Sequence, residues 1–142
     1  MPPTVRLSLL LSPLLALALW AAAAFAEELP SWKDLPATDA QQVAITQEAV
    51  RATLAGQKQE LVAWRDIQEI RIVTTDQGPA AEDVFWVFLH HDGKRLLRVP
   101  GSLVDDAALD LLMQLARFDH DQFIKSMGSA DNAVFRVWKK QD

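Results

Sequence analysis

Six consecutive apolar residues at positions 84–89, Val-Phe-Trp-Val-Phe-Leu, constrain the fold of this chain more than any other stretch. Successive side chains of a strand point to opposite faces of its sheet, so this strand is apolar on both faces. Both faces must then be covered by other parts of the chain. Asp92 and Gly93 follow, before a second run at residues 95–99, and predict a type I′ hairpin in which both turn residues have positive φ.

The chain before this hairpin also predicts strands. In residues 43–54 the apolar positions alternate in two opposite phases, as expected for two strands joined by a turn or bulge at residues 47–48. The alternative is one helix over residues 40–55 that ends at Gly56. We favour the strands because Gly56 leads into another strand-like run at residues 60–64.

Two more strands are predicted farther along the chain. Residues 67–74 alternate and are rich in β-branched side chains, after an irregular step at residues 65–66. Residues 133–138 form the last strand, after a turn at Asp131 and Asn132.

Two helices are predicted between the hairpin and the last strand. The first begins near Ser102 and Asp105 and carries an apolar stripe over about four turns. The second is short, begins at Asp119 with a Gln three residues later, and ends at Gly128. The residues predicted to face inward are Val104, Ala108, Leu111, Leu112 and Leu115 on the first helix and Phe123, Ile124 and Met127 on the second.

These elements place the chain in the α+β class. We expect a mostly antiparallel, bent sheet of about five to six strands, with two helices of the C-terminal half packed on it. Residues 43–142 form a single domain with one modest core. Residues 27–42 carry prolines and polar residues, which indicates a linker or arm. Trp32 and Leu35 are costly in a free tail, so we expect this arm to lie partly against the domain.

The first 26 residues have the order of a secretory signal peptide. Arg6 precedes an apolar run over residues 7–25, and small residues surround a cleavage site after Ala26. The alternative is an uncleaved anchor in the inner membrane, because residues 7–26 are long enough to cross a bilayer as a helix. We favour the signal peptide and therefore a periplasmic or secreted protein.

The charge of the mature chain limits its partners. Arg6 is the only charge in residues 1–26, so the remainder carries 13 Lys and Arg against 19 Asp and Glu, a net charge of −6. This excess opposes binding to nucleic acid and to anionic lipid headgroups. The chain has no cysteine, which excludes disulfides and thiol nucleophiles.

The histidines invite a metal or acid–base interpretation. His90, His91 and Asp92 are adjacent, and His120 lies between two Asp residues. Neighbouring strand side chains point to opposite faces, so a polar hairpin end is favoured over a metal site. We assign no catalytic residue and no metal ligand. We expect no cofactor, because neither a nucleophile motif nor a glycine-rich phosphate loop is present.

The polar segment at residues 74–83 is the best candidate for binding. Loops held by a rigid sheet concentrate binding residues, and this loop is rich in acids and hydroxyls. The candidate residues are Thr74, Thr75, Asp76, Gln77, Glu82 and Asp83. The alternative is a simple turn built by Asp76, Gly78 and Pro79.

Three tryptophans, Trp64, Trp86 and Trp138, lie on or beside three predicted strands. Aromatic residues at such positions usually belong to the core. If the three were exposed together, they would form a binding face.

A set of short motifs is spread over residues 43–139. The motifs are Trp64-Arg65-Asp66-Ile67, Ile70, Thr74-Thr75-Asp76-Gln77-Gly78-Pro79, Asp83-Val84-Phe85-Trp86, Phe118-Asp119, Met127-Gly128-Ser129, Asn132 and Phe135 to Trp138. Together they resemble a family of small uncharacterised bacterial proteins. In the family pattern a Gly precedes the Phe-Asp pair and an Asn follows it, whereas Arg117 and His120 stand there in this chain. The early strands also look like bacterial pleckstrin-homology-like domains, which implies a bent antiparallel sheet closed by a helix.

Our leading hypothesis is an exported, non-enzymatic module that binds a protein or peptide through residues 74–83 and the neighbouring strand ends. One alternative is a small periplasmic metal-dependent hydrolase that uses His90, His91 or His120 with nearby acids. Another is a structural factor in envelope assembly that acts through exposed sheet edges.

Overall fold

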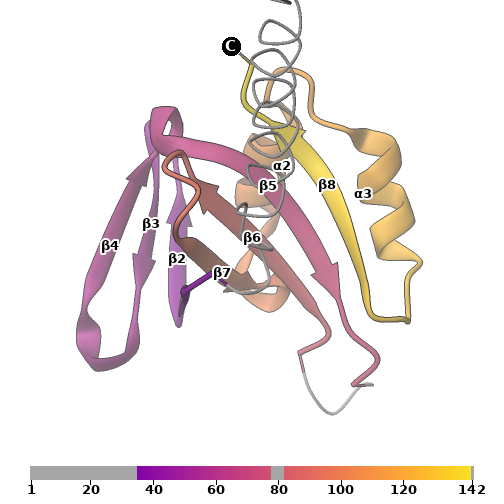
Figure 1. The fold of residues 1–142 in the computed structure, drawn as a ribbon, viewed down its shortest axis with the longest axis horizontal. Helices are drawn as coiled ribbons and strands as arrows, with labels where there is room; N and C mark the ends of the chain where they lie inside the picture. The colour runs from indigo at the N-terminus through magenta and orange to yellow at the C-terminus, as the bar shows by residue number, and fades with distance from the viewer. Residues whose placement is uncertain (1–34, 78–81, 142) are drawn as a thin grey trace, which may run out of the picture. The chain divides into compact units, whose positions relative to one another are not determined.

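The structure, a computed structural model, describes residues 35–77 and 82–141. In this part of the chain, eight strands and two α-helices form an α+β domain (Figure 1). The five-stranded sheet has the order β1 (Ala37–Asp39), β7 (Leu96–Pro100), β6 (Val84–His90), β5 (Ile67–Thr74), β8 (Ala133–Lys139). The three-stranded sheet has the order β2 (Gln42–Ile45), β3 (Ala49–Thr53), β4 (Gln59–Ala63). The helices are α2 (Asp106–Met113) and α3 (His120–Met127).

The predicted α+β class is confirmed, and its strands are mostly antiparallel as expected. The described strands form two sheets, however, and not one bent sheet of five to six strands. The short 3₁₀ turn η3 (Trp64–Asp66) lies between β4 of one sheet and β5 of the other, where an irregular step was predicted at residues 65–66. β1 is the exception to the antiparallel pattern, since it runs parallel to β7.

The two apolar phases of residues 43–54 belong to a hairpin, which confirms the strand interpretation over the helix. Val43 of β2 lies opposite Ala52 of β3, and Ile45 lies opposite Val50. The phase changes because the chain reverses at residues 46–48, so all four side chains face the same way. The Thr46 hydroxyl stabilises this turn by accepting the Ala49 N–H at 3.2 Å.

The expected arm contributes to the sheet. Residues 27–34 lie outside the described residues, but β1 pairs with β7, and Ala40 is 4% exposed. Asp39 holds Arg98 of β7 through two hydrogen bonds. The hydrogen bonds that Arg98 donates to the Asp39 carboxylate raise the pKa of its guanidinium above the ordinary value. The packed domain therefore begins before residue 43.

The predicted hairpin joins β6 to β7, but the type I′ turn was wrong. Gly93 has a φ of +69°, whereas Asp92 is not among the described residues with positive φ. The turn is longer, with the His90 N–H donating to the Arg95 carbonyl at 3.0 Å. The Asp92 carboxylate accepts the Lys94 N–H at 2.8 Å, which satisfies a backbone donor without a left-handed residue at Asp92.

The first helix is shorter than predicted. It begins at Asp105, whose carboxylate accepts the Ala108 N–H at 2.8 Å, and it ends after eight residues. Ser102 lies in the preceding 3₁₀ turn η4 (Gly101–Leu103) and does not cap α2. The apolar stripe had predicted a helix of about four turns, and the helix that forms is shorter.

The second helix has the predicted ends but not the predicted inner face. Asp119 accepts the Gln122 N–H at 3.0 Å, and Gly128 is the C-cap. Ile124 and Met127, predicted to face inward, are 66% and 54% exposed. The buried face runs instead through Ser126, which is 1% exposed and donates to the Phe123 carbonyl at 2.6 Å. A small side chain at this position lets α3 lie close to the sheet.

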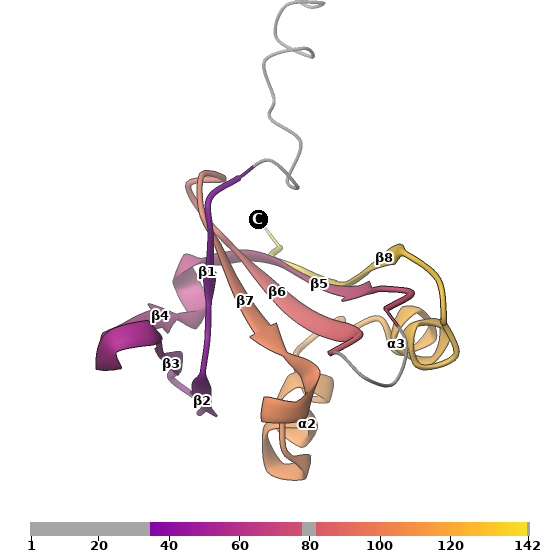
Figure 2. The same cartoon turned by 90° about the horizontal axis from the view of Figure 1, so that it is seen from below.

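One hydrophobic core extends through both sheets and the helices. Both helices lie on the same side of the five-stranded sheet (Figure 2). Trp86 and Phe88 of β6 belong to this core, and Val87, which points to the opposite face, is 3% exposed. The face of β6 toward the helices is therefore buried as its sequence predicted, whereas on the other face Val87 is buried and Phe85 and Leu89 are partly buried. Neither helix in the described ranges has the length and apolar character needed to cross a membrane.

The cap assignment predicts unequal effects of two substitutions. Asp105→Ala should lower the free energy of unfolding by about 1 kcal/mol, because the Ala108 N–H loses its acceptor. Ser102→Ala, at the cap position expected from the sequence, should change it by less than about 0.5 kcal/mol. Urea unfolding followed by circular dichroism measures both values, and a larger loss for Ser102→Ala would contradict the assignment.

The hairpin turn predicts a pH effect. The backbone hydrogen bond from Lys94 lowers the pKa of Asp92 below its ordinary value of 3.8. A carboxyl group with a lowered folded-state pKa stabilises the fold above pH 3.8, and this contribution is lost as the pH falls through the lower value. An NMR titration should show Asp92 protonating below pH 3.8, and Lys94→Pro, which removes the donor, should return the pKa toward it.

Candidate functional site

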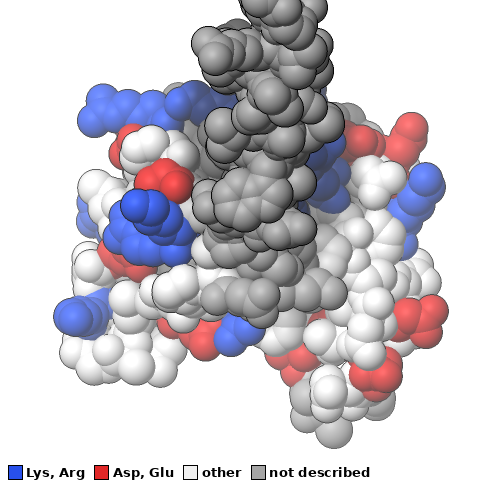
Figure 3. Space-filling view, viewed as in Figure 1, with Lys and Arg blue, Asp and Glu red and all other residues white. Residues whose placement is uncertain are grey.

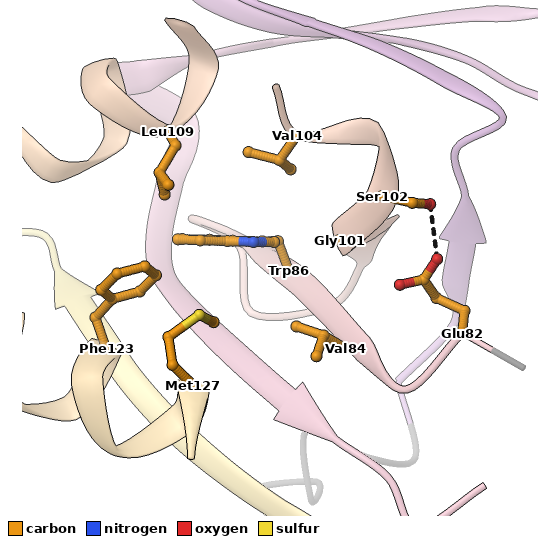
Figure 4. Close-up of a pocket in the computed structure, with 9 residues that line it drawn as sticks. All are labelled: Glu82, Val84, Trp86, Gly101, Ser102, Val104, Leu109, Phe123 and Met127. Atoms are coloured by element: carbon orange, nitrogen blue, oxygen red, sulfur yellow. Dashed lines mark hydrogen bonds between the residues drawn. The ribbon is translucent and has the colours of Figure 1, made fainter. Parts of the chain in front are cut away.

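An apolar groove lies between the two helices, over β6 (Figure 4). It is an open hollow of about 320 Å³. Its lining comes from three separate parts of the chain: Glu82, Val84 and Trp86; Gly101, Ser102, Val104 and Leu109; Phe123 and Met127. The groove exists because two short helices cover this face of the sheet where one long helix would have closed it.

Trp86 forms the centre of the groove. It is 3% exposed, and its ring lies 6.0 Å from the ring of Phe123 between the centroids. Phe118, which precedes α3, packs on the other side of Phe123 with a centroid distance of 6.0 Å. This row of aromatic rings holds α3 in place beside β8, and Met127 then projects along one wall (Figure 4).

Glu82 and Ser102 form the polar end of the groove. The Ser102 hydroxyl donates to a Glu82 carboxylate oxygen at 2.7 Å (Figure 4). Gly101 allows this contact, because a Cβ atom there would lie 3.2 Å from the Val84 carbonyl oxygen. The missing side chain lets the turn η4 rest directly on the start of β6.

The predicted binding residues are divided between two places. Residues 78–81, within the predicted segment, lie outside the described residues. Glu82 lines the groove, whereas Thr74 is 1% exposed and buried at the end of β5. The Thr74 hydroxyl bonds with the Asp131 carbonyl at 2.7 Å and the Ser129 hydroxyl at 2.9 Å. Thr74 therefore holds the turn before β8 and is not available to a ligand.

The residues that follow Thr74 are held at the same place, where the ends of β5 and β8 meet. The Thr75 N–H donates to the Asp83 carbonyl at 2.9 Å, and the buried Thr75 hydroxyl has no hydrogen-bond partner in the described part of the chain. The Asp76 N–H donates to the Asn132 side chain at 3.3 Å. The side chains of Asp76, Gln77 and Asp83 are exposed. Motif residues 74–76, 129 and 132, which are far apart in the sequence, thus meet at one structural corner.

The histidines are dispersed, as the alternation of strand side chains indicated. His90 is 6% exposed, and its Nε2 lies 3.3 Å from a Glu60 carboxylate oxygen without hydrogen-bond geometry. His91 is exposed, 3.9 Å from Asp66, and His120 packs edge-on against Phe118. Within residues 35–77 and 82–141, no three His, Asp or Glu side chains lie together as a metal-binding group.

The three tryptophans do not form a shared binding face. Trp64 donates its indole N–H to the Thr46 carbonyl at 2.8 Å, and Trp138 donates to the Ala116 carbonyl at 3.1 Å. Trp86 alone lines the groove. The sequence interpretation missed this groove because it assigned Val104, Phe123 and Met127 to the closed core. The available signal was Ser126, a polar residue among the positions that α3 had to bury.

The two adjacent threonines predict opposite outcomes for the same substitution. Thr74→Val should lower the free energy of unfolding by about 1 kcal/mol, because the buried Thr74 hydroxyl loses its hydrogen bonds to the Asp131 carbonyl and the Ser129 hydroxyl. Thr75→Val should leave it unchanged within about 0.5 kcal/mol or raise it, because a methyl group replaces a buried hydroxyl that makes no hydrogen bond. If urea unfolding gives equal losses of free energy for the two variants, the structural role proposed for the Thr74 hydroxyl is wrong.

No protein-family model, curated protein or solved structure matches this chain.

Proposed function

We propose that this domain is a non-enzymatic module that binds a protein or peptide in the groove between α2 and α3. The observation that carries the proposal is the open apolar hollow above Trp86, whose wall includes the 54% exposed Met127. Exposing apolar side chains beside a hollow costs free energy, and such a surface is typical of binding sites.

The polar groups of the groove support binding over catalysis. Glu82 and Ser102 are the polar side chains of the lining, and they bond to each other. A serine nucleophile needs a general base that a third group orients, and a carboxylate that accepts the hydroxyl hydrogen bond supplies only part of that arrangement. A single polar pair at the end of an apolar hollow is suited to orienting a ligand.

The corner at Thr74 has a supporting role in this proposal. It fixes the ends of β5 and β8, and through the Thr75–Asp83 hydrogen bond it also fixes the chain that enters β6. Glu82 precedes Asp83 directly, so the same bond positions the polar end of the groove. The proposed binding surface therefore lies beside the loop predicted from the sequence and shares Glu82 with it.

We further propose that the module works outside the cytoplasm, in the periplasm or after secretion. The signal-like order of residues 1–26 supports this location, and the absence of cysteine is compatible with an oxidising compartment. An inner-membrane anchor formed by residues 7–26 would place the domain in the same compartment.

A peptide-display selection tests the proposal with a matched pair of variants. Peptides selected on the purified protein should bind Met127→Lys more than tenfold more weakly, because the substitution places a charge in the apolar wall. Ile124→Lys is the control, since Ile124 is similarly exposed on the same helix but does not line the groove. Selected peptides that bind both variants as tightly as the parent would overturn the groove as the binding site.

A further inference from the structure

We propose, on the basis of this binding function, that the groove takes a peptide segment in which a large apolar side chain is flanked by Lys or Arg. The hollow itself indicates the large apolar side chain. Its volume of about 320 Å³ has room for a Leu, Phe or Trp side chain. The partly exposed Phe123 ring and the exposed Met127 side chain offer apolar surface on which such a side chain can pack.

The charge of the segments that form the groove indicates the flanking Lys or Arg residues. Residues 82–86, 101–110 and 123–127 carry five acids and one base, a net charge of −4. The acids are Glu82, Asp83, Asp105, Asp106 and Asp110, and the base is Lys125. All except the half-buried Glu82 are exposed to solvent. Acids around an apolar centre attract a cationic segment and orient it before the apolar side chain enters.

The positions of these charges fit a short segment. Glu82 lies at the polar end of the hollow, and Asp105 and Asp106 begin α2 directly after Val104 of the lining. The last turn of α3, which carries Met127, also carries Lys125, so the acids lie on the other walls of the groove. Figure 3 looks on the opposite face of the five-stranded sheet, away from the groove, where acidic and basic side chains are mixed.

The same charges argue against an acyl chain as the occupant. A fatty acid would fill the apolar hollow, but its carboxylate would lie at the mouth among acids of the same sign. Like charges close together cost free energy, and an ionised carboxylate has no hydrogen-bond donor to offer Glu82. A basic side chain pairs with these acids, whereas a carboxylate is repelled.

Four defined probes test the inference. The peptide acetyl-Lys-Phe-Lys-amide, its variants with Glu in place of Lys and with Ala in place of Phe, and decanoate are titrated into the purified protein by calorimetry. The Lys-Phe-Lys peptide should bind at least tenfold more tightly than each of the others. Its affinity should fall as salt is raised, because the acids act over about 10 Å at 0.1 M salt.

Charge variants separate a local effect from the net charge. Glu82→Gln, which keeps an acceptor for Ser102, should weaken the Lys-Phe-Lys peptide several-fold and bring the Glu-Phe-Glu peptide closer to it. Asp76→Asn removes the same charge from an exposed residue outside the groove lining and should leave both affinities unchanged. Equal effects of the two variants would overturn the assignment of Glu82.

The outcomes distinguish this inference from the function on which it rests. If the Glu-Phe-Glu peptide binds as tightly as Lys-Phe-Lys and Met127→Lys abolishes both, the peptide groove stands and its preference for basic segments is wrong. If decanoate binds most tightly, the groove takes an acyl chain and both proposals fail. If no probe binds and the display selection yields no peptide sensitive to Met127→Lys, both proposals fail as well.

Discussion

The structure depends on the burial of β6 on both faces. An apolar strand of this kind cannot lie at the surface, so β5 and β7 pair with its two edges and the helices cover one of its faces. Its register is set by the same requirement, because a shift of one residue would exchange Trp86 and Phe88 with Val87. The remaining elements are arranged around this strand, and the three-stranded sheet completes the core beyond it.

The groove forms because two separate short helices cover this face of β6. Asp105 and Asp119 start two separate short helices, and the chain between them reverses through Arg117, whose φ is +65°. Two short helices leave a gap where one long helix would have packed continuously. The gap lies over Trp86, the largest side chain of β6, so its floor is aromatic and firmly held. A rigid floor lowers the entropic cost of binding a ligand.

Stability and recognition are separated at the end of the sheet. Thr74 uses its hydroxyl to hold the turn before β8, and Asp76 is fixed through its backbone N–H. These polar residues have structural partners, which explains why a loop rich in hydroxyls and acids need not be reactive. The charge that remains for a partner lies instead at Glu82 and on the exposed acids Asp105, Asp106 and Asp110, at the start of α2 and within it. We propose that, in a chain of net negative charge, these acids favour a basic partner over phosphate or anionic lipid.

The sequence by itself determined the α+β class, most strand positions, the hairpin and the second helix with its Asp119 cap. Each of these depends on local rules: alternation, turn residues and side-chain caps. It also identified Glu82, but only as one acid among several. The split into two sheets, the short α2, the outward turn of Met127 and the burial of Thr74 were decided by tertiary structure. These features depend on contacts between residues far apart in the chain, such as Thr74 with Asp131 and Trp86 with Phe123, and no local pattern encodes such contacts.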